Sequence, residues 1–163
     1  NDLGKIEKEL EKLKVVLKPG AEINGSVIET NIGISKDYNI FELQNAIGTK
    51  DVLKANKIIN YFSKNEKAHP LVLTVGFLFS YFSKVVTVQF SPNKENDGKL
   101  AQEVGVNPYF LKDYKQATRN YSASKLVKII GYLKDTDLKS KGVNNTSTTH
   151  GELLKELTFK ILH

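Results

Sequence analysis

The sequence predicts an all-α protein, and three observations lead to that prediction. Apolar residues recur at steps of three and four along most of the chain, which is the spacing of helices with one buried face. Proline, glycine and capping residues separate these stretches and mark where helices begin and end. The composition, with 40% hydrophobic and 26% charged residues among 163, is typical of a folded domain and excludes a disordered or low-complexity chain.

Two helices are expected before residue 36. The first ends at Lys18-Pro19-Gly20, because proline cannot continue the helical hydrogen bonds. The second is short, begins after a cap at Asn24-Gly25-Ser26 and closes near Gly33. The apolar stripe of the first helix consists of Leu3, Ile6, Leu10, Leu13 and Leu17.

Two more helices follow. Asn39 is expected to cap the first of them, and Gly48 is expected to end it. The next covers residues 51–62, and the side chains expected to face inward are those of Leu53, Ile58, Ile59 and Phe62.

Residues 71–90 form an almost continuous apolar run. Pro70 before it suits the first turn of a helix. The run is long enough to span a membrane, but Lys84 lies well inside it with several Ser, Thr and Gln residues, and its flanks show no basic asymmetry. We therefore predict a fully buried central helix, and the alternation over residues 85–88 leaves a strand as the alternative.

The rest of the chain predicts four further helices, each with a local signal at one end. These signals are Gly105 after residues 99–104, the Asn107-Pro108 pair, Ser122 before a long helix, and the capping box Thr149-x-x-Glu152 after a polar loop at 142–148.

The net charge of +6 comes from 24 basic and 18 acidic residues, and Arg119 is the only arginine. Residues 1–35 carry five basic and six acidic groups, so the positive charge belongs to residues 36–163. Lysine suits contact with phosphates, whereas bidentate reading of guanine favours arginine. Contact with a nucleic-acid backbone is one interpretation, and a general lysine bias of the genome is the other.

Sequence motifs of catalysis are scarce. The chain has no cysteine and no phosphate-binding glycine motif, so thiol chemistry, Cys-based metal sites and a nucleotide-binding loop of that type are excluded. None of the three histidines has a second metal-ligating residue three or four positions further along the chain, so a metal site is not expected. The histidines are His69, His150 and His163. Asp135 and Asp137 would point about 200° apart on a helix and are interpreted as surface charges. We expect no enzymatic activity, no metal and no cofactor.

Residues 100–111 have the pattern of a helix-turn-helix. Ala101 would let two helices cross closely, and Gly105 would take the turn. A tight corner in any helical core has the same steric needs, and the absence of arginine there favours that interpretation. The side chains that the second helix would offer to a major groove are Asn107, Tyr109, Lys112 and Asp113.

Four groups of residues along the chain carry a family resemblance. They are Asn1-Asp2-Leu3 with Ile6, Glu9-Leu10 and Lys12-Leu13; residues 38–43 with 51–55; residues 104–109 with Lys112 and 117–122; and Leu133, Asp135, 137–140 and Gly142 with Glu152-Leu153-Leu154. Their order and type resemble those of bacterial DNA polymerase III delta subunits. Lys8 departs from the family, which usually has asparagine there, and the run at 71–90 is unusually rich in Val and Phe.

The resemblance implies a clamp-loader subunit. Residues 1–35 would be the end of a small helical lid domain related to AAA+ proteins, and residues 36–163 a helical collar domain that joins a pentameric loader ring. Because the sequence begins at Asn1 and has no methionine, we expect a piece of a longer product that lacks the N-terminal domain. That domain would contact the sliding clamp. Delta subunits are not the ATPase of the loader, which itself serves the DNA polymerase III holoenzyme.

The implied partners are other loader subunits of the delta-prime and gamma/tau types and, in the assembled complex, primed DNA. No membrane is expected, and the implied location is the cytoplasm. A stand-alone basic DNA-binding regulator built on the helix-turn-helix-like segment remains the alternative.

Two sets of residues are candidate contact sites. The subunit interface is predicted on the last helix at Leu153, Leu154, Leu157, Ile161 and Leu162, with the alternative that all five are internal core. Nucleic-acid or acidic-partner contact is predicted at Lys112, Lys115, Arg119, Lys125 and Lys128, with a solvated surface as the alternative.

Overall fold

A computed structural model describes residues 20–22, 38–145 and 147–163. The chain divides into two units, Asn1–Tyr38 and Asn39–His163. The helices predicted around residues 3–17 and 24–33 lie outside the described residues. The domain boundary between residues 35 and 36 stays a prediction.

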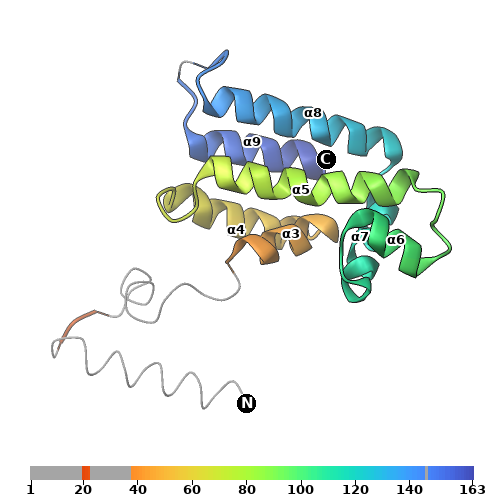
Figure 1. The fold of residues 1–163 in the computed structure, drawn as a ribbon. Coiled ribbons are helices and arrows are strands. Elements are labelled where there is room, and N and C mark those ends of the chain that lie inside the picture. Colours follow the sequence, from red (N-terminus) through yellow and green to blue (C-terminus); the bar gives the residue numbers. More distant parts are fainter. Residues whose placement is uncertain (1–19, 23–37, 146) are drawn as a thin grey trace. The chain divides into compact units, whose positions relative to one another are not determined.

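The second unit is built from helices (Figure 1). Among the described residues there is no strand, so the all-α prediction is confirmed and the strand alternative for residues 71–90 is excluded. In chain order the elements are α3 (Ile40–Gly48), α4 (Val52–Lys64), α5 (Leu71–Phe90), α6 (Asp97–Val104), the 3₁₀ turn η1 (Pro108–Phe110), α7 (Leu111–Asn120), α8 (Ala123–Ser140) and α9 (His150–Leu162).

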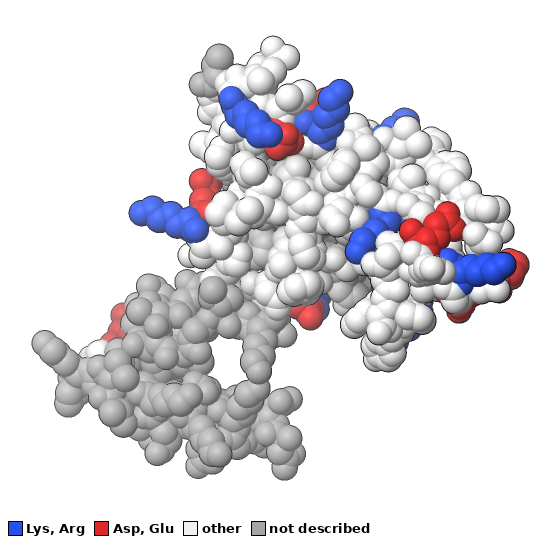
Figure 2. Space-filling model, viewed as in Figure 1, with Lys and Arg blue, Asp and Glu red and all other residues white. Residues whose placement is uncertain are grey.

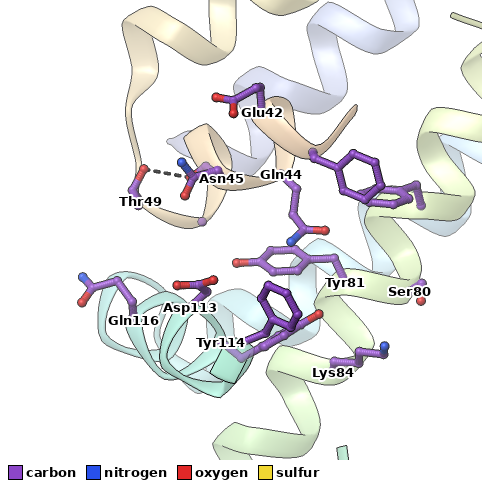
Figure 3. A pocket seen from close by; sticks show the side chains of 14 residues that line it. Glu42, Gln44, Asn45, Thr49, Ser80, Tyr81, Lys84, Asp113, Tyr114 and Gln116 are labelled. Carbon is purple, nitrogen blue, oxygen red and sulfur yellow. Dashed lines mark hydrogen bonds between the residues drawn. The ribbon is translucent and has the colours of Figure 1, made fainter. Parts of the chain in front are cut away.

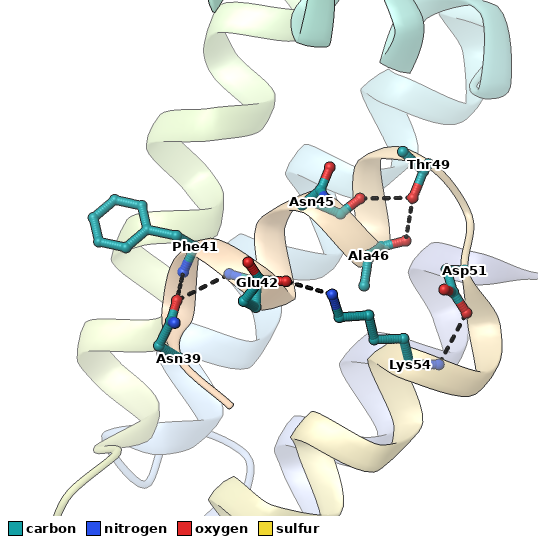
Figure 4. Close-up of polar contacts among 8 residues, drawn as sticks. All are labelled: Asn39, Phe41, Glu42, Asn45, Ala46, Thr49, Asp51 and Lys54. Atoms are coloured by element: carbon teal, nitrogen blue, oxygen red, sulfur yellow. Dashed lines mark hydrogen bonds and ion pairs between the residues drawn. The ribbon is translucent and has the colours of Figure 1, made fainter. Parts of the chain in front are cut away.

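The predicted capping residues begin the helices as expected. The Asn39 side chain accepts hydrogen bonds from the backbone N–H groups of Phe41 and Glu42, at 2.9 and 3.0 Å (Figure 4). Thr149 and Glu152 form the predicted capping box at the start of α9. These bonds satisfy backbone donors that have no partner within a helix, so the local sequence determines where α3 and α9 start.

Helix α5 is the centre of the unit. It packs against α8 and α7 most extensively and also contacts α3, α6 and α9, while α4 and α9 form a second closely packed pair. Figure 1 shows α8, α9, α5 and α4 running side by side along their lengths, with α6 and α7 at one end. The side chains of Leu78, Phe82 and Val85 on α5 are fully buried in this core.

A smaller apolar cluster holds the corner formed by α6, η1 and α7. Val88 of α5 packs there with Leu100, Ala101 and Val104 of α6 and with Leu111 of α7. Gly105 ends α6 with φ of 68°, a left-handed conformation that favours glycine. The predicted roles of Ala101 and Gly105 in a tight corner are therefore confirmed.

Two burial predictions were wrong. Leu53 was expected to face inward, but it is 68% exposed. The buried residues of α4 are Ala55, Ile58, Ile59 and Phe62, and Leu53 falls on the opposite side because it lies two residues before this series. Helix α5 was expected to be fully buried, yet one side of it is open to solvent.

Candidate interaction surfaces

The five apolar residues predicted as a subunit interface on α9 lie inside the unit. None is more than 4% exposed, because α9 packs its apolar side against α4 and α8. Their side chains therefore fill the core, which was the alternative interpretation, and any interface must be sought on other residues. The residues are Leu153, Leu154, Leu157, Ile161 and Leu162.

Two of the five predicted basic contact residues are held by contacts within the chain. Lys115 pairs with Asp97 at 2.6 Å and donates to the backbone carbonyl of Lys94 at 3.1 Å. Lys125 donates to the carbonyl of Lys160 at 2.7 Å. Burial lowers the pKa of Lys125, and the neighbouring charges of Lys50 and Lys128 lower it further.

The other three basic residues are exposed. The Lys112 ammonium lies 4.8 Å from the ring centroid of Tyr109. Arg119 lines a shallow pocket of about 350 Å³ with Lys115, but Glu95 lines the same pocket. On the face shown in Figure 2, basic side chains stand beside acidic ones instead of forming a continuous basic surface. Contact with nucleic acid at these residues stays a prediction.

The helix-turn-helix-like segment is tied to the core on both of its helices. Helix α6 packs against α5, and α7 lies between α5 and α3 with Ala117 fully buried. Asn107 is used locally, since its side chain accepts a hydrogen bond from the backbone N–H of Tyr109 at 2.9 Å. These contacts are those of a structural corner.

The open side of α5 carries a continuous uncharged stripe, which we call the α5 stripe. Its residues are spaced by steps of four and three in alternation, so they form one line along the helix over about 27 Å. A small residue follows each of the first two large apolar ones, and a side-chain carbon at Gly76 would meet no atom within 4 Å. The stripe consists of Val72, Gly76, Phe79, Ser83, Val86 and Phe90.

Three apolar side chains of the α5 stripe are strongly exposed. Val72 is 43% exposed, Phe79 47% and Phe90 60%, whereas Ser83 and Val86 are half-buried. An exposed apolar line with small gaps matches the surface that one helix offers to the side chains of another. Contact with a helix of a second protein would remove these side chains from water, which is the main favourable term in association.

The α5 stripe could not be predicted from the sequence because α5 is apolar on nearly every side. Periodicity distinguishes a buried side from a solvated side only when the solvated side is polar. The signal that does exist is the placement of the small residues Gly76 and Ser83 on the same line as Phe79.

Helix α5 has the length and composition of a membrane-crossing helix, with a mean hydropathy of 1.8. Core helices of globular domains pass the same test. The inner side of α5 is buried against α7 and α8, which is the packing expected of a core helix.

The described residues contain no candidate metal site. No cluster of three or more His, Asp or Glu residues that could hold a metal ion occurs among residues 38–145 and 147–163. His69 stacks on the ring of Phe62 with 3.9 Å between centroids, and burial lowers the pKa of its imidazole. His69 and His150 line one small pocket together with Glu66, and His163 is not among its lining residues.

These features define a class: an all-helical domain with an uncharged, partly exposed line on its central helix. Comparison with known families identifies the group. The sequence profile described as DNA polymerase III delta subunit, C-terminal domain, matches residues 37–156. The chain therefore belongs to the family of DNA polymerase III delta subunits, as the sequence resemblance implied.

A solved structure supports the fold assignment. The chain is similar to the Bacillus subtilis DNA clamp loader delta protein (YqeN), with a TM-score of 0.63 and 20% sequence identity. The match covers 98% of this chain and 46% of that protein, so this chain spans about half the length of its structural relative. No curated protein matches the sequence.

Proposed function

We propose that this chain is an assembly domain that joins a clamp-loader delta subunit to its neighbours in the loader. The observation that carries the proposal is the α5 stripe, an exposed uncharged line on a chain with 26% charged residues. Depletion of charge together with exposed aromatic side chains is typical of the centre of a protein–protein interface.

The partner that suits the α5 stripe is an amphipathic helix of another loader subunit. Phe79 and Phe90 would enter gaps between the partner's side chains, and Gly76 would let the partner helix approach closely. The proposed partners are subunits of the delta-prime and gamma/tau types, in a ring that loads the sliding clamp on primed DNA in the cytoplasm. The chain itself would act without catalysis, and contact with the clamp would belong to an N-terminal domain.

A binding measurement with two matched variants tests this function. Phe79→Lys places a charge in the middle of the α5 stripe, whereas Val127→Lys places one on α8 at a residue that is 59% exposed. By calorimetric titration with another loader subunit, we expect Phe79→Lys to weaken binding by about thirtyfold or more, as for an interface hot spot. Val127→Lys should bind like the unmodified chain. Equal binding by both variants would refute the proposed interface.

The alternative, a DNA-binding regulator, is supported by the exposure of Tyr109 and Lys112 beside the α6–α7 corner. It predicts sequence-specific binding of duplex DNA that is lost on substitution of either residue. The assembly function predicts little affinity of the isolated chain for duplex DNA. A gel-shift titration at two salt concentrations distinguishes them, because non-specific phosphate contact weakens steeply with salt.

A further inference from the structure

A pocket of about 620 Å³ lies between α3, α5 and α7, away from the α5 stripe (Figure 3). Its volume is in the range of small-molecule sites, which is about 300–1,000 Å³. Five aromatic residues line it, and the rings of Tyr81 and Tyr114 lie 5.4 Å apart. The aromatic residues are Phe41, Phe77, Tyr81, Phe110 and Tyr114.

Tyr81 is the most informative of these residues because it is only 4% exposed. In the part of the chain that the structure describes, its hydroxyl has no hydrogen-bond partner. Figure 3 shows this hydroxyl pointing toward the side of the pocket where Thr49 and Asp113 lie. A side chain on Gly48 would overlap the Tyr81 hydroxyl, so glycine leaves room for this hydroxyl. The hydroxyl is not shut off from solvent, and a bound group can replace water as its hydrogen-bond acceptor.

Glu42 and Thr49 at the pocket are used within the chain, since Glu42 pairs with Lys54 and the Thr49 hydroxyl donates to the carbonyl of Asn45. Four other polar side chains make no hydrogen bond or ion pair within the described residues. Gln44 and Gln116 offer amide groups, Asp113 a carboxylate and Lys84 an ammonium. In Figure 3, Asp113 and Gln116 lie on one side of Tyr81, and Lys84 lies on the other. Burial raises the pKa values of Tyr81 and Tyr114. The neighbouring Tyr114 raises that of Tyr81 further and the negative charge of Asp113 raises both, so both hydroxyls stay protonated as donors.

We propose that this pocket binds a single nucleotide, with the base on the aromatic rings, its N–H groups on Asp113 and its phosphate at Lys84. Aromatic side chains that stack on bases are the usual way in which proteins hold unpaired nucleotides. A carboxylate accepts N–H groups of a base edge, and an ammonium suits a phosphate. Guanine fits best, because it presents two adjacent N–H groups to one carboxylate. The proposal goes beyond the assembly function and does not depend on it.

A nucleotide explains the pocket better than a segment of a partner protein. A cationic side chain would meet Asp113 and the aromatic faces but would be repelled by Lys84. An apolar side chain would displace water from the Tyr81 hydroxyl without offering it a hydrogen bond. A planar base joined to a phosphate uses the rings, the carboxylate and the ammonium together.

Titration of the 163-residue chain with guanosine monophosphate, followed by NMR chemical shifts, tests the proposal. We expect saturable shifts at Phe77, Tyr81 and Tyr114, weaker binding of the other nucleoside monophosphates, and no binding of ribose 5-phosphate. A single-stranded oligonucleotide rich in guanine forms the second arm. Tighter binding of the oligonucleotide through the same residues would identify a strand as the source of the nucleotide, and tighter binding of the free nucleotide would identify a small ligand.

Three single substitutions test the carboxylate, the ammonium and the tyrosine hydroxyl of the pocket one at a time. Asp113→Asn should weaken guanosine monophosphate at least tenfold, Lys84→Gln should weaken nucleotide but not nucleoside, and Tyr81→Phe should reduce affinity while preserving the ring. Lys134→Gln and Asp135→Asn, exposed on α8, are matched controls that should bind normally. The proposal is overturned if no nucleotide shifts the pocket residues, if ribose 5-phosphate binds as well, or if a partner peptide alone occupies the pocket.

Discussion

The buried hydroxyl of Tyr121 donates a hydrogen bond of 2.7 Å to the backbone carbonyl of Ile47, 74 residues earlier in the chain. Beside it, the Asn120 side chain donates to the carbonyl of Gly48 at 2.8 Å. Both carbonyls belong to the last turn of α3, where the regular hydrogen bonds to residues four positions later end. The end of α7 thus donates hydrogen bonds to the end of α3, and these bonds hold α3 and α7, two walls of the nucleotide pocket, together.

Replacing Tyr121 with phenylalanine tests that link. We expect Tyr121→Phe to lower the free energy of unfolding by about 1 kcal/mol, the usual net value of a buried hydrogen bond. The loss should not be larger, because the carbonyl of Ile47 also accepts from the backbone N–H of Lys50 at 3.0 Å. Urea denaturation measures it. Tyr132→Phe, at a half-buried ring on α8, should change stability less, and an equal loss in both variants would contradict the assignment.

Alkaline pH should destabilise the folded chain through its buried tyrosines. Burial raises the pKa of Tyr121 and of Tyr81 above the ordinary 10.0, with smaller contributions from neighbouring tyrosines and, at Tyr81, from Asp113. The unfolded chain therefore loses these protons first, so their stabilising contribution is complete below pH 10 and is lost as the pH rises toward the folded-state values.

Denaturation midpoints measured between about pH 8 and pH 11.5 check this expectation. The unmodified chain should become less stable above pH 10, and the double variant Tyr81→Phe/Tyr121→Phe should show a smaller decline. An equally steep decline in the double variant would assign the effect to other groups.

Two helical glycines should respond in opposite ways to alanine. At Gly151, a side-chain carbon would lie 2.9 Å from Cβ of Ser63 and 3.2 Å from its carbonyl, and the backbone N–H of Gly151 donates to Glu66 at 2.8 Å. We expect Gly151→Ala to destabilise the chain by about 1–3 kcal/mol, as overpacking does. At Gly131 on α8 nothing lies within 4 Å, so Gly131→Ala should stabilise by about 0.5–1 kcal/mol.

Thermal unfolding of the two single variants is sufficient to compare them. A stable Gly151→Ala variant would mean that α4 and α9 can separate at no cost, against the close approach seen between Gly151 and Ser63.

A substitution at Gly76 should weaken binding of a partner without lowering the stability of the chain. Gly76→Leu fills open space on the α5 stripe, so the isolated chain should keep or gain stability because leucine favours helix. The same side chain would keep a partner helix from approaching closely, so affinity for another loader subunit should fall at least tenfold. Unchanged affinity would place the partner elsewhere. Gly131→Ala serves as the control that gains stability without losing affinity.

The helices could be predicted from the sequence because their signals are local. Asn39, Ser122 and Thr149 cap α3, α8 and α9 with hydrogen bonds to backbone groups two or three residues away. Leu53 was misplaced because an apolar residue was counted toward the core although it breaks the three- and four-residue spacing of Ala55, Ile58 and Ile59.

The surfaces could be predicted less well, since they depend on how distant segments meet. Leu157 and Ile161 have the same spacing whether α9 packs on its own chain or on a partner. The nucleotide pocket joins Gln44, Tyr81 and Asp113 from three helices, and no pattern in the sequence connects them. Only the packing of α3, α5 and α7 brings them together.

A cysteine-protection experiment tests the central claim most directly, because the chain has no cysteine of its own. Single cysteines are introduced at Val72, Phe79, Val86 and Phe90 on the α5 stripe and at Val127 and Phe159 outside it, and each is alkylated with and without the other loader subunits. The assembly function predicts protection at the four stripe residues and free reaction at the other two. Protection at Val127 and Phe159 with a fully reactive stripe would contradict it.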